Sequence, residues 1–131
     1  MLAPLAATAC SGTHQADGRA PTVVRVSERD FRIRVPARIP AGDVRLVVTN
    51  HGPDQHELIV VRASTDELPL RSDGATIDED SLEPVTVGVL EAGTVGSTRE
   101  LDLHLQPGRY EVFCNMAGHY LGGMSAAFTV V

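Results

Sequence analysis

The strict alternation of polar and apolar residues from Thr98 to Leu105 is the feature that most constrains how this chain can fold. It places Leu101, Leu103 and Leu105 on one face, which is typical of a strand with one buried side and one side in solvent. Short β-forming runs recur along the chain, with Gly- and Pro-containing turns between them, at residues 22–27, 31–35, 43–49, 56–62, 84–90, 109–114 and 125–131. No long stretch has helical periodicity. The sequence therefore predicts an all-β sandwich or barrel of seven to eight strands.

One long polar segment interrupts this pattern. Residues 63–83 are rich in acidic side chains and are broken by Pro69 and Gly74. We expect a long acidic loop there, with a helical turn near residues 78–82. The chain has 131 residues, which suits one domain with a short extension. We assign residues 22–131 to that single β domain.

The N-terminal residues differ in character from the rest. Residues 1–9 are small and apolar and are followed by Cys10. This is similar to the end of a secretory signal peptide and to the lipobox of bacterial lipoproteins, although Ala7 stands where Leu is usual and no basic segment precedes it. We expect residues 1–10 to be the remnant of such a segment and residues 11–21 to be a flexible tether. The alternative is an Ala-rich tail on a cytoplasmic protein.

This interpretation of the N-terminus predicts an exported bacterial or archaeal protein that works outside the cytoplasm. A lipid on Cys10 would be its membrane attachment, because the apolar stretch is too short to span a bilayer. The formal net charge of the chain is −6, and all eleven basic residues are arginines. Nucleic-acid binding needs a positive footprint, and no basic run supplies one, so we expect no nucleic-acid partner.

The residues best suited to chemistry lie near the C-terminus. Cys114, His119 and Met124 follow one another at the spacing Cys-x4-His-x4-Met between the last two predicted strands, and His56 opens an earlier strand. A thiolate, two imidazoles and a thioether suit one copper ion that cycles between Cu(I) and Cu(II). Loops cluster at the ends of a sandwich, so all four side chains would meet at one end. Met116 is a second candidate for the thioether, and the alternative without a metal is a core thiol, a packed methionine and a surface histidine.

Other centres fit the same residues less well. Structural zinc prefers four Cys or His ligands and does not use Met. A binuclear copper centre needs a second Cys in the loop, and an iron–sulfur cluster needs more thiolates. A hydrolase built on Cys114 and His119 would need an orienting partner or acid, and the sequence indicates none.

Two segments resemble the cupredoxin family of small blue-copper proteins, which includes plastocyanin and azurin. They are Tyr110-Glu-Val-Phe-Cys-Asn-Met-Ala-Gly-His-Tyr-Leu-Gly-Gly-Met124 and Asn50-x-Gly-x3-His56, with a loop spacing closest to the rusticyanin type. The resemblance covers residues 22–131 and implies a Greek-key β-sandwich with one copper ion at one end, held by His56, Cys114 and His119 with Met124 as a weak axial ligand. One position departs from the family: Glu57 follows the first ligand histidine, where many members have Asn.

The resemblance also implies a function. The protein would carry single electrons between redox partner proteins, which would dock near His119 at a small apolar patch of residues 117–121. The alternative is a lipoprotein that delivers or buffers copper, although such proteins tend to have open, Met- and His-rich sites. In either case we expect a monomer that is not an enzyme.

Overall fold

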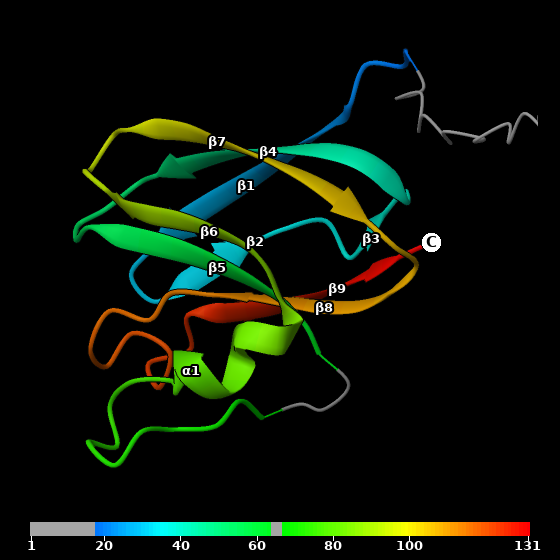
Figure 1. The fold of residues 1–131 in the computed structure, drawn as a ribbon. Helices are drawn as coiled ribbons and strands as arrows, with labels where there is room; N and C mark the ends of the chain where they lie inside the picture. Colours follow the sequence, from blue (N-terminus) through cyan, green and yellow to red (C-terminus); the bar gives the residue numbers. More distant parts are fainter. Residues whose placement is uncertain (1–17, 64–66) are drawn as a thin grey trace, which may run out of the picture.

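The computed structural model describes residues 18–63 and 67–131, in which nine strands form two sheets packed face to face (Figure 1). One sheet has the order β2-β1-β4-β7, with the strands Arg32–Arg34, Thr22–Arg29, Gly42–Asn50 and Thr98–Leu105. The other has the order β3-β9-β8-β5-β6, with the strands Arg38–Ile39, Ser125–Val130, Gly108–Phe113, His56–Arg62 and Thr86–Gly93. A helical turn, α1 (Glu79–Leu82), and a 3-10 turn, η1 (Glu83–Val85), precede β6. The predicted all-β sandwich is confirmed.

Alternation decides which face of each strand in the first sheet is buried. In β4, Val44, Leu46 and Val48 are buried, whereas the residues between them are partly or fully exposed. β4 pairs with β1 in parallel and with β7 antiparallel, so that Leu46 lies between Val24 and Leu101. Each such aliphatic side chain gains about 1.5–3 kcal/mol from full burial, which holds this sheet against the core.

The second sheet forms the other wall of the core and is covered on both sides along β5. Leu58 and Val60 belong to the main apolar cluster between the sheets. Ile59 and Val61 belong to a second cluster on the outer face. Burial on both faces explains the unbroken apolar run in this strand, because neither face needs polar residues.

The acidic segment packs on that outer face. Leu68, Ile77 and Leu82 join the second cluster, and α1 lies against the sheet of β5 and β8 (Figure 1). The side chain of Asp78 caps α1 by accepting a hydrogen bond from the Ser81 N–H at 3.4 Å. The predicted helical turn is therefore confirmed, and apolar side chains anchor a segment whose charges stay near the surface.

Some predicted bounds are wrong for physical reasons. The predicted strand over residues 31–35 begins one residue too early: β2 begins at Arg32, and Phe31 lies in the turn after β1 with 47% of its surface exposed. Alternation alone does not show where a tight turn ends. Pro84 has no N–H for a strand ladder and lies in η1, so β6 begins only at Thr86. The expected turn over residues 36–42 also contains the two-residue strand β3.

The predicted N-terminal remnant, residues 1–10 with Cys10, lies outside the described residues. The structure describes the predicted tether, residues 11–21, only from Gly18 onward. In the described part of the chain, no helix has the length and apolar character needed to cross a membrane.

Candidate metal centre

Three predicted donor side chains meet at one end of the sandwich. His56 is the first residue of β5, Cys114 follows the last residue of β8, and His119 lies on the loop before β9. The two Nδ1 atoms of His56 and His119 are 3.3 Å apart. The Sγ of Cys114 lies 3.5 Å from Nδ1 of His119 and 4.0 Å from Nδ1 of His56. The three donor atoms therefore form a triangle around one point.

The size of this triangle suits a metal ion. Zinc, a comparable ion, binds imidazole nitrogen at about 2.0–2.1 Å and thiolate sulfur at about 2.3 Å. Three such donors in a trigonal arrangement are separated by about 3.5 Å for the two nitrogens and about 3.8 Å for nitrogen and sulfur. The separations of 3.3, 3.5 and 4.0 Å in the structure lie around these values. His56, Cys114 and His119 are thus positioned to hold one metal ion.

Burial favours the neutral forms of Cys114 and His56. Cys114 and His56 are fully buried, and His119 is 8% exposed. Loss of hydration raises the pKa of the Cys114 thiol to about 11. Loss of hydration also lowers the pKa of His56, against the opposing effect of the Asp30 carboxylate. A metal ion must therefore displace the thiol proton, whereas the imidazole of His56 is already neutral at physiological pH.

The fourth predicted ligand, Met124, lies at the end of the same loop. Its side chain is fully buried in the main core cluster. Its N–H donates to the His119 carbonyl at 3.0 Å, and its carbonyl accepts from the Cys114 N–H at 3.2 Å. Met116 is only partly buried, against the edge of the same cluster. The backbone thus ties Met124 to both donors of the loop.

Residues 114–124, which we call the donor loop, are folded by local backbone bonds. The His119 N–H donates to the Met116 carbonyl at 2.9 Å, which holds the backbone at His119 in place. Gly118 and Gly123 have φ angles of +79° and +106°. Side chains disfavour this left-handed region, and glycine does not, so glycine at these two positions lets the loop bend sharply.

Asn115 connects the donor loop to the acidic segment and to β5. Its side chain accepts from the Ile77 N–H at 2.6 Å and donates to the Ile77 carbonyl at 3.1 Å and to the Glu79 carboxylate at 2.7 Å. Its backbone N–H donates to the Glu57 carboxylate at 3.1 Å. Glu57 follows His56, so this bond joins the two strand ends that carry the first two donors. Burial raises the pKa of Glu57, and the hydrogen bond from Asn115 partly offsets that effect.

A carboxylate from the β1–β2 turn contacts the far side of the His56 ring. Asp30 Oδ1 lies 2.8 Å from Nε2 of His56, close enough for a strong electrostatic contact although the two atoms are not aligned as a straight hydrogen bond. A carboxylate at Nε2 favours the tautomer that carries its proton there, which leaves the lone pair of Nδ1 free for a metal. Nothing in the sequence marks Asp30 as a residue of the site, because its local sequence is that of an ordinary turn.

Phe31, from the same turn, packs against the second histidine. The rings of Phe31 and His119 meet edge to face, with centroids 5.4 Å apart and planes at 83°. A Cβ atom at Gly122 would lie 3.0 Å from the Phe31 ring, so glycine lets this ring approach the donor loop. The exposed carboxylate of Asp54 lies 3.7 Å from Nε2 of His119. Phe31 and Asp54 therefore flank the outer edge of the imidazole.

The exposed patch near His119 differs from the prediction in one residue. Leu121 is 55% exposed, as a surface patch requires. Tyr120, however, turns toward the acidic segment, where its ring packs edge to face on Phe113 at 6.0 Å and its hydroxyl accepts from the Leu68 N–H at 3.4 Å. The aromatic residue beside His119 is Phe31 instead.

No protein-family model matches the chain, and no curated protein matches it in sequence. Solved structures match its shape. Auracyanin from Roseiflexus castenholzii is 18% identical, with 86% of this chain and 99% of that chain covered and a TM-score of 0.59. Auracyanin B is 20% identical, with 86% and 91% covered and a TM-score of 0.64. Rusticyanin from Thiobacillus ferrooxidans is 18% identical, with 86% and 79% covered and a TM-score of 0.60. The chain has the cupredoxin fold.

Within this cupredoxin fold, the donor triangle lies where β5 begins and β8 ends. The spacing of the donor loop and the strand start at His56 were enough to find Cys114, His119 and His56. The flanking residues Asp30 and Phe31 come from a different turn, and no motif in the sequence connects that turn to the donors.

Proposed function

We propose that this protein carries single electrons through one copper ion, held by Nδ1 of His56, Sγ of Cys114 and Nδ1 of His119, with Met124 as a weak axial ligand. The convergence of the three donor atoms within 4.0 Å carries the proposal. A trigonal site of two imidazoles and one thiolate fully satisfies neither oxidation state of copper, so little geometry changes when an electron moves. Rusticyanin, which shares the fold, is a copper protein.

The surroundings of the donors support electron transfer rather than catalysis or metal exchange. Cys114, His56 and Met124 are fully buried, so a substrate or a chelating partner has no direct access to them. The donor side chains are also held in position before a metal binds, because backbone hydrogen bonds and the side chain of Asn115 hold the donor loop in place. His119 is the most exposed of the four side chains and is the route by which electrons would enter and leave.

The proposal includes a location outside the cytoplasm. It rests on the small apolar N-terminal residues and on Cys10, which resemble a signal peptide followed by a lipobox. Residues 22–131 would then work as a monomeric domain on a tether, within reach of redox partners. Mass spectrometry of the protein isolated from its source cells would test this, since an unmodified Cys10 would exclude the lipid anchor.

Spectroscopy of the copper-loaded protein tests the electron-carrier function. Cu(II) should give an intense blue thiolate-to-copper absorption, which Cys114→Ser abolishes. A colourless Cu(II) adduct would contradict the proposal. Voltammetry should show a reversible one-electron wave, whereas rapid transfer of copper to a metal-free acceptor without such a wave would favour copper delivery.

The two loop methionines provide a matched test of the axial ligand. Met124→Leu should keep the blue colour and raise the reduction potential, because loss of a thioether donor destabilises Cu(II) more than Cu(I). Met116→Leu removes the same atoms from the same loop and should leave the potential unchanged. The reverse pattern would assign the axial position to Met116.

A further inference from the structure

Four exposed arginines gather on the outer face of β1 and β2. In the antiparallel register of these strands, Arg29 lies directly opposite Arg32, and Ser27 lies opposite Arg34. Arg25 precedes Ser27 by two residues on β1. Opposite residues share a face of a sheet, as do alternate residues of one strand, so all four guanidinium groups extend from the outer face. We call Arg25, Arg29, Arg32 and Arg34 the arginine patch.

The arginine patch is not neutralised by the protein. In residues 18–63 and 67–131, no carboxylate lies within ion-pair distance of its four arginines, whereas Arg45 on the same sheet pairs with Asp102 at 2.7 Å. Like charges directly opposite each other on a sheet are destabilising, which applies to the Arg29–Arg32 pair. The chain as a whole has a net charge of −6. An uncompensated positive face on an acidic protein indicates a ligand that supplies the negative charge.

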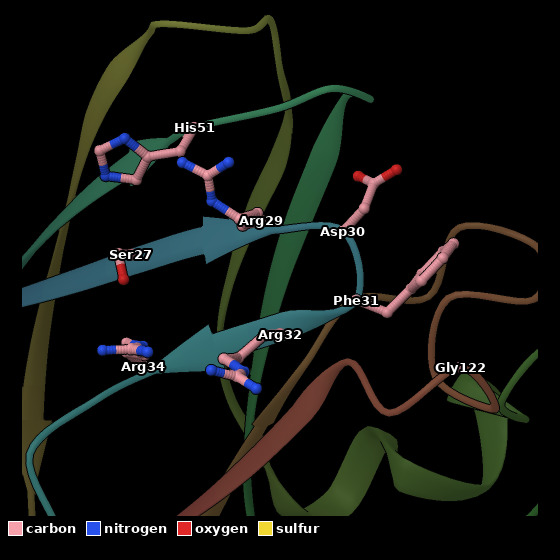
Figure 2. Close-up of a pocket in the computed structure, with 8 residues that line it drawn as sticks. All are labelled: Ser27, Arg29, Asp30, Phe31, Arg32, Arg34, His51 and Gly122. Atoms are coloured by element: carbon pink, nitrogen blue, oxygen red, sulfur yellow. The ribbon is translucent and has the colours of Figure 1, made fainter.

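The patch borders the metal centre. Arg29, Arg32 and Arg34 line a pocket of about 460 Å³ together with Phe31 and Gly122 (Figure 2). Phe31 is one of the two residues between β1 and β2 and packs edge to face on His119. Asp30 also lines the pocket, but its carboxylate is directed to His56 at 2.8 Å. A molecule bound to the patch would therefore be separated from the His119 imidazole by a single aromatic ring.

We propose that the arginine patch docks a redox partner protein through a cluster of acidic side chains on that partner. The inference rests on the proposed electron-carrier function. Guanidinium groups bind carboxylates with two parallel charge-assisted hydrogen bonds, and a positive face steers an acidic partner toward it over a longer range. In the docked complex, the metal held beside Phe31 would exchange one electron with the partner's redox centre, and no covalent bond would form or break.

The shape of the surface favours a protein over a small anion. A second pocket continues along the same face and is lined by Arg25, Arg34 and His51. The positive surface thus extends over both strands as an open groove, which several carboxylates of one partner can occupy together. On the other side of the donor loop, Asp80 and Glu79 of the acidic segment are exposed. This difference in charge would orient the partner, because an acidic protein is attracted to one flank and repelled by the other.

Binding to the patch can be tested without any redox chemistry. The probe is hexacyanochromate(III), a redox-inert paramagnetic trianion, added to the ¹⁵N-labelled zinc-loaded protein at low ionic strength. Amide signals of residues 27–34 and of Gly122 should broaden first. The triple variant Arg29→Gln, Arg32→Gln, Arg34→Gln should lose this broadening.

A matched control removes the same net charge elsewhere. Its substitutions are also on exposed arginines, at Arg19→Gln, Arg38→Gln and Arg71→Gln, and it should keep the broadening pattern. Circular dichroism and the absorption spectrum of the copper-loaded variants verify that both fold. Equal loss of broadening in the two triple variants would overturn the proposal, because net charge alone would then explain the effect.

A second experiment measures the rate of electron transfer to small oxidants of opposite charge. The reduced copper-loaded protein is mixed with hexacyanoferrate(III), an anionic oxidant, or with tris(phenanthroline)cobalt(III), a cationic oxidant. At low ionic strength the rate of reaction with the anionic oxidant should be lower in the patch variant than in the wild type by a factor of about ten or more. The patch variant should not be slower with the cationic one, and the control variant should resemble the wild type with both oxidants.

The outcomes separate this inference from the proposed function. A protein without a reversible redox wave would refute the electron-carrier function, while the experiment with zinc-loaded protein would still report on the patch. Equal oxidation rates of wild type and patch variant by the anionic oxidant would overturn the docking role. Patch-dependent binding of phosphatidylglycerol vesicles, with no hexacyanochromate site, would also overturn it and would assign the patch to an anionic membrane.

Discussion

Because burial raises the pKa of the Cys114 thiol to about 11, copper(I) binding at neutral pH must remove a proton from that sulfur. A pH of 7 lies about four units below the pKa of this thiol, so ionising it requires about 5 kcal/mol. When a metal ion binds the thiolate, the free energy of the metal–sulfur bond offsets this requirement. Each unit of increase in pH lowers the requirement by about 1.36 kcal/mol. Between pH 7.5 and 9.5, the apparent affinity for copper(I) should therefore rise about 100-fold.

The assay is anaerobic competition with a chromophoric copper(I) chelator at several pH values, corrected for the titration of the chelator. This window lies above the usual range of imidazole titration, and burial lowers the pKa of His56 further. The slope of log affinity against pH should be about one, for the release of one proton. Met116→Leu should have the same slope. Cys114→Ser should bind weakly, with no such slope in this window.

Two results would refute this reasoning. A flat profile in the wild type would mean that Cys114 is already ionised in the metal-free protein or is not a ligand. A slope near two would mean that a second group besides Cys114 loses a proton on binding, which is incompatible with a neutral His56 imidazole if His56 is that group.

Three further predictions concern the residues around the centre. Asp30→Asn should weaken copper(I) binding about 10- to 100-fold in the same competition assay, because the His56 tautomer is then less well fixed; unchanged affinity would remove Asp30 from this role. Burial raises the pKa of Glu28 to about 7 from 4.5, so the folded state binds this proton more tightly than the unfolded state. Stability is then lost as the pH rises from 4.5 toward 7, by about 3 kcal/mol, and urea unfolding of metal-free Glu28→Gln should lack this loss. Phe113→Ala should lower the free energy of urea unfolding by about 3–5 kcal/mol through a cavity in the second cluster, while the copper-loaded variant stays blue; loss of colour would show that the cluster also shapes the centre.

The elements that the sequence predicted well are those whose signal is local. The alternation in residues 98–105 corresponds to β7, and the apolar run after His56 corresponds to β5, with the histidine at its first residue as expected. The spacing of Cys114 and His119 is also local, because both lie on one short loop. The predicted bounds of a strand were wrong where a turn sets the start of that strand. Phe31 continues the alternating pattern in the sequence, but it lies in the turn before β2 and is exposed.

The positions of the residues that flank the donors depend on which strands pair, and no local pattern in the sequence contains that information. β1 runs parallel to β4, so the turns that follow these two strands lie at the same end of the sheet. There, the Asp30 N–H donates to the Gly52 carbonyl at 3.0 Å, and the His51 N–H donates to the Glu28 carbonyl at 2.8 Å. This pairing carries the Asp30 carboxylate to the His56 ring, although β2 and β3 separate β1 from β4 in the sequence. The same end also receives the donor loop and, through Asn115, the acidic segment. A metal ion held there would contact residues from two of these segments, and the other two would support those residues. Its binding should therefore stabilise the whole sandwich rather than one loop, by a free energy that grows with the logarithm of its affinity for the folded chain.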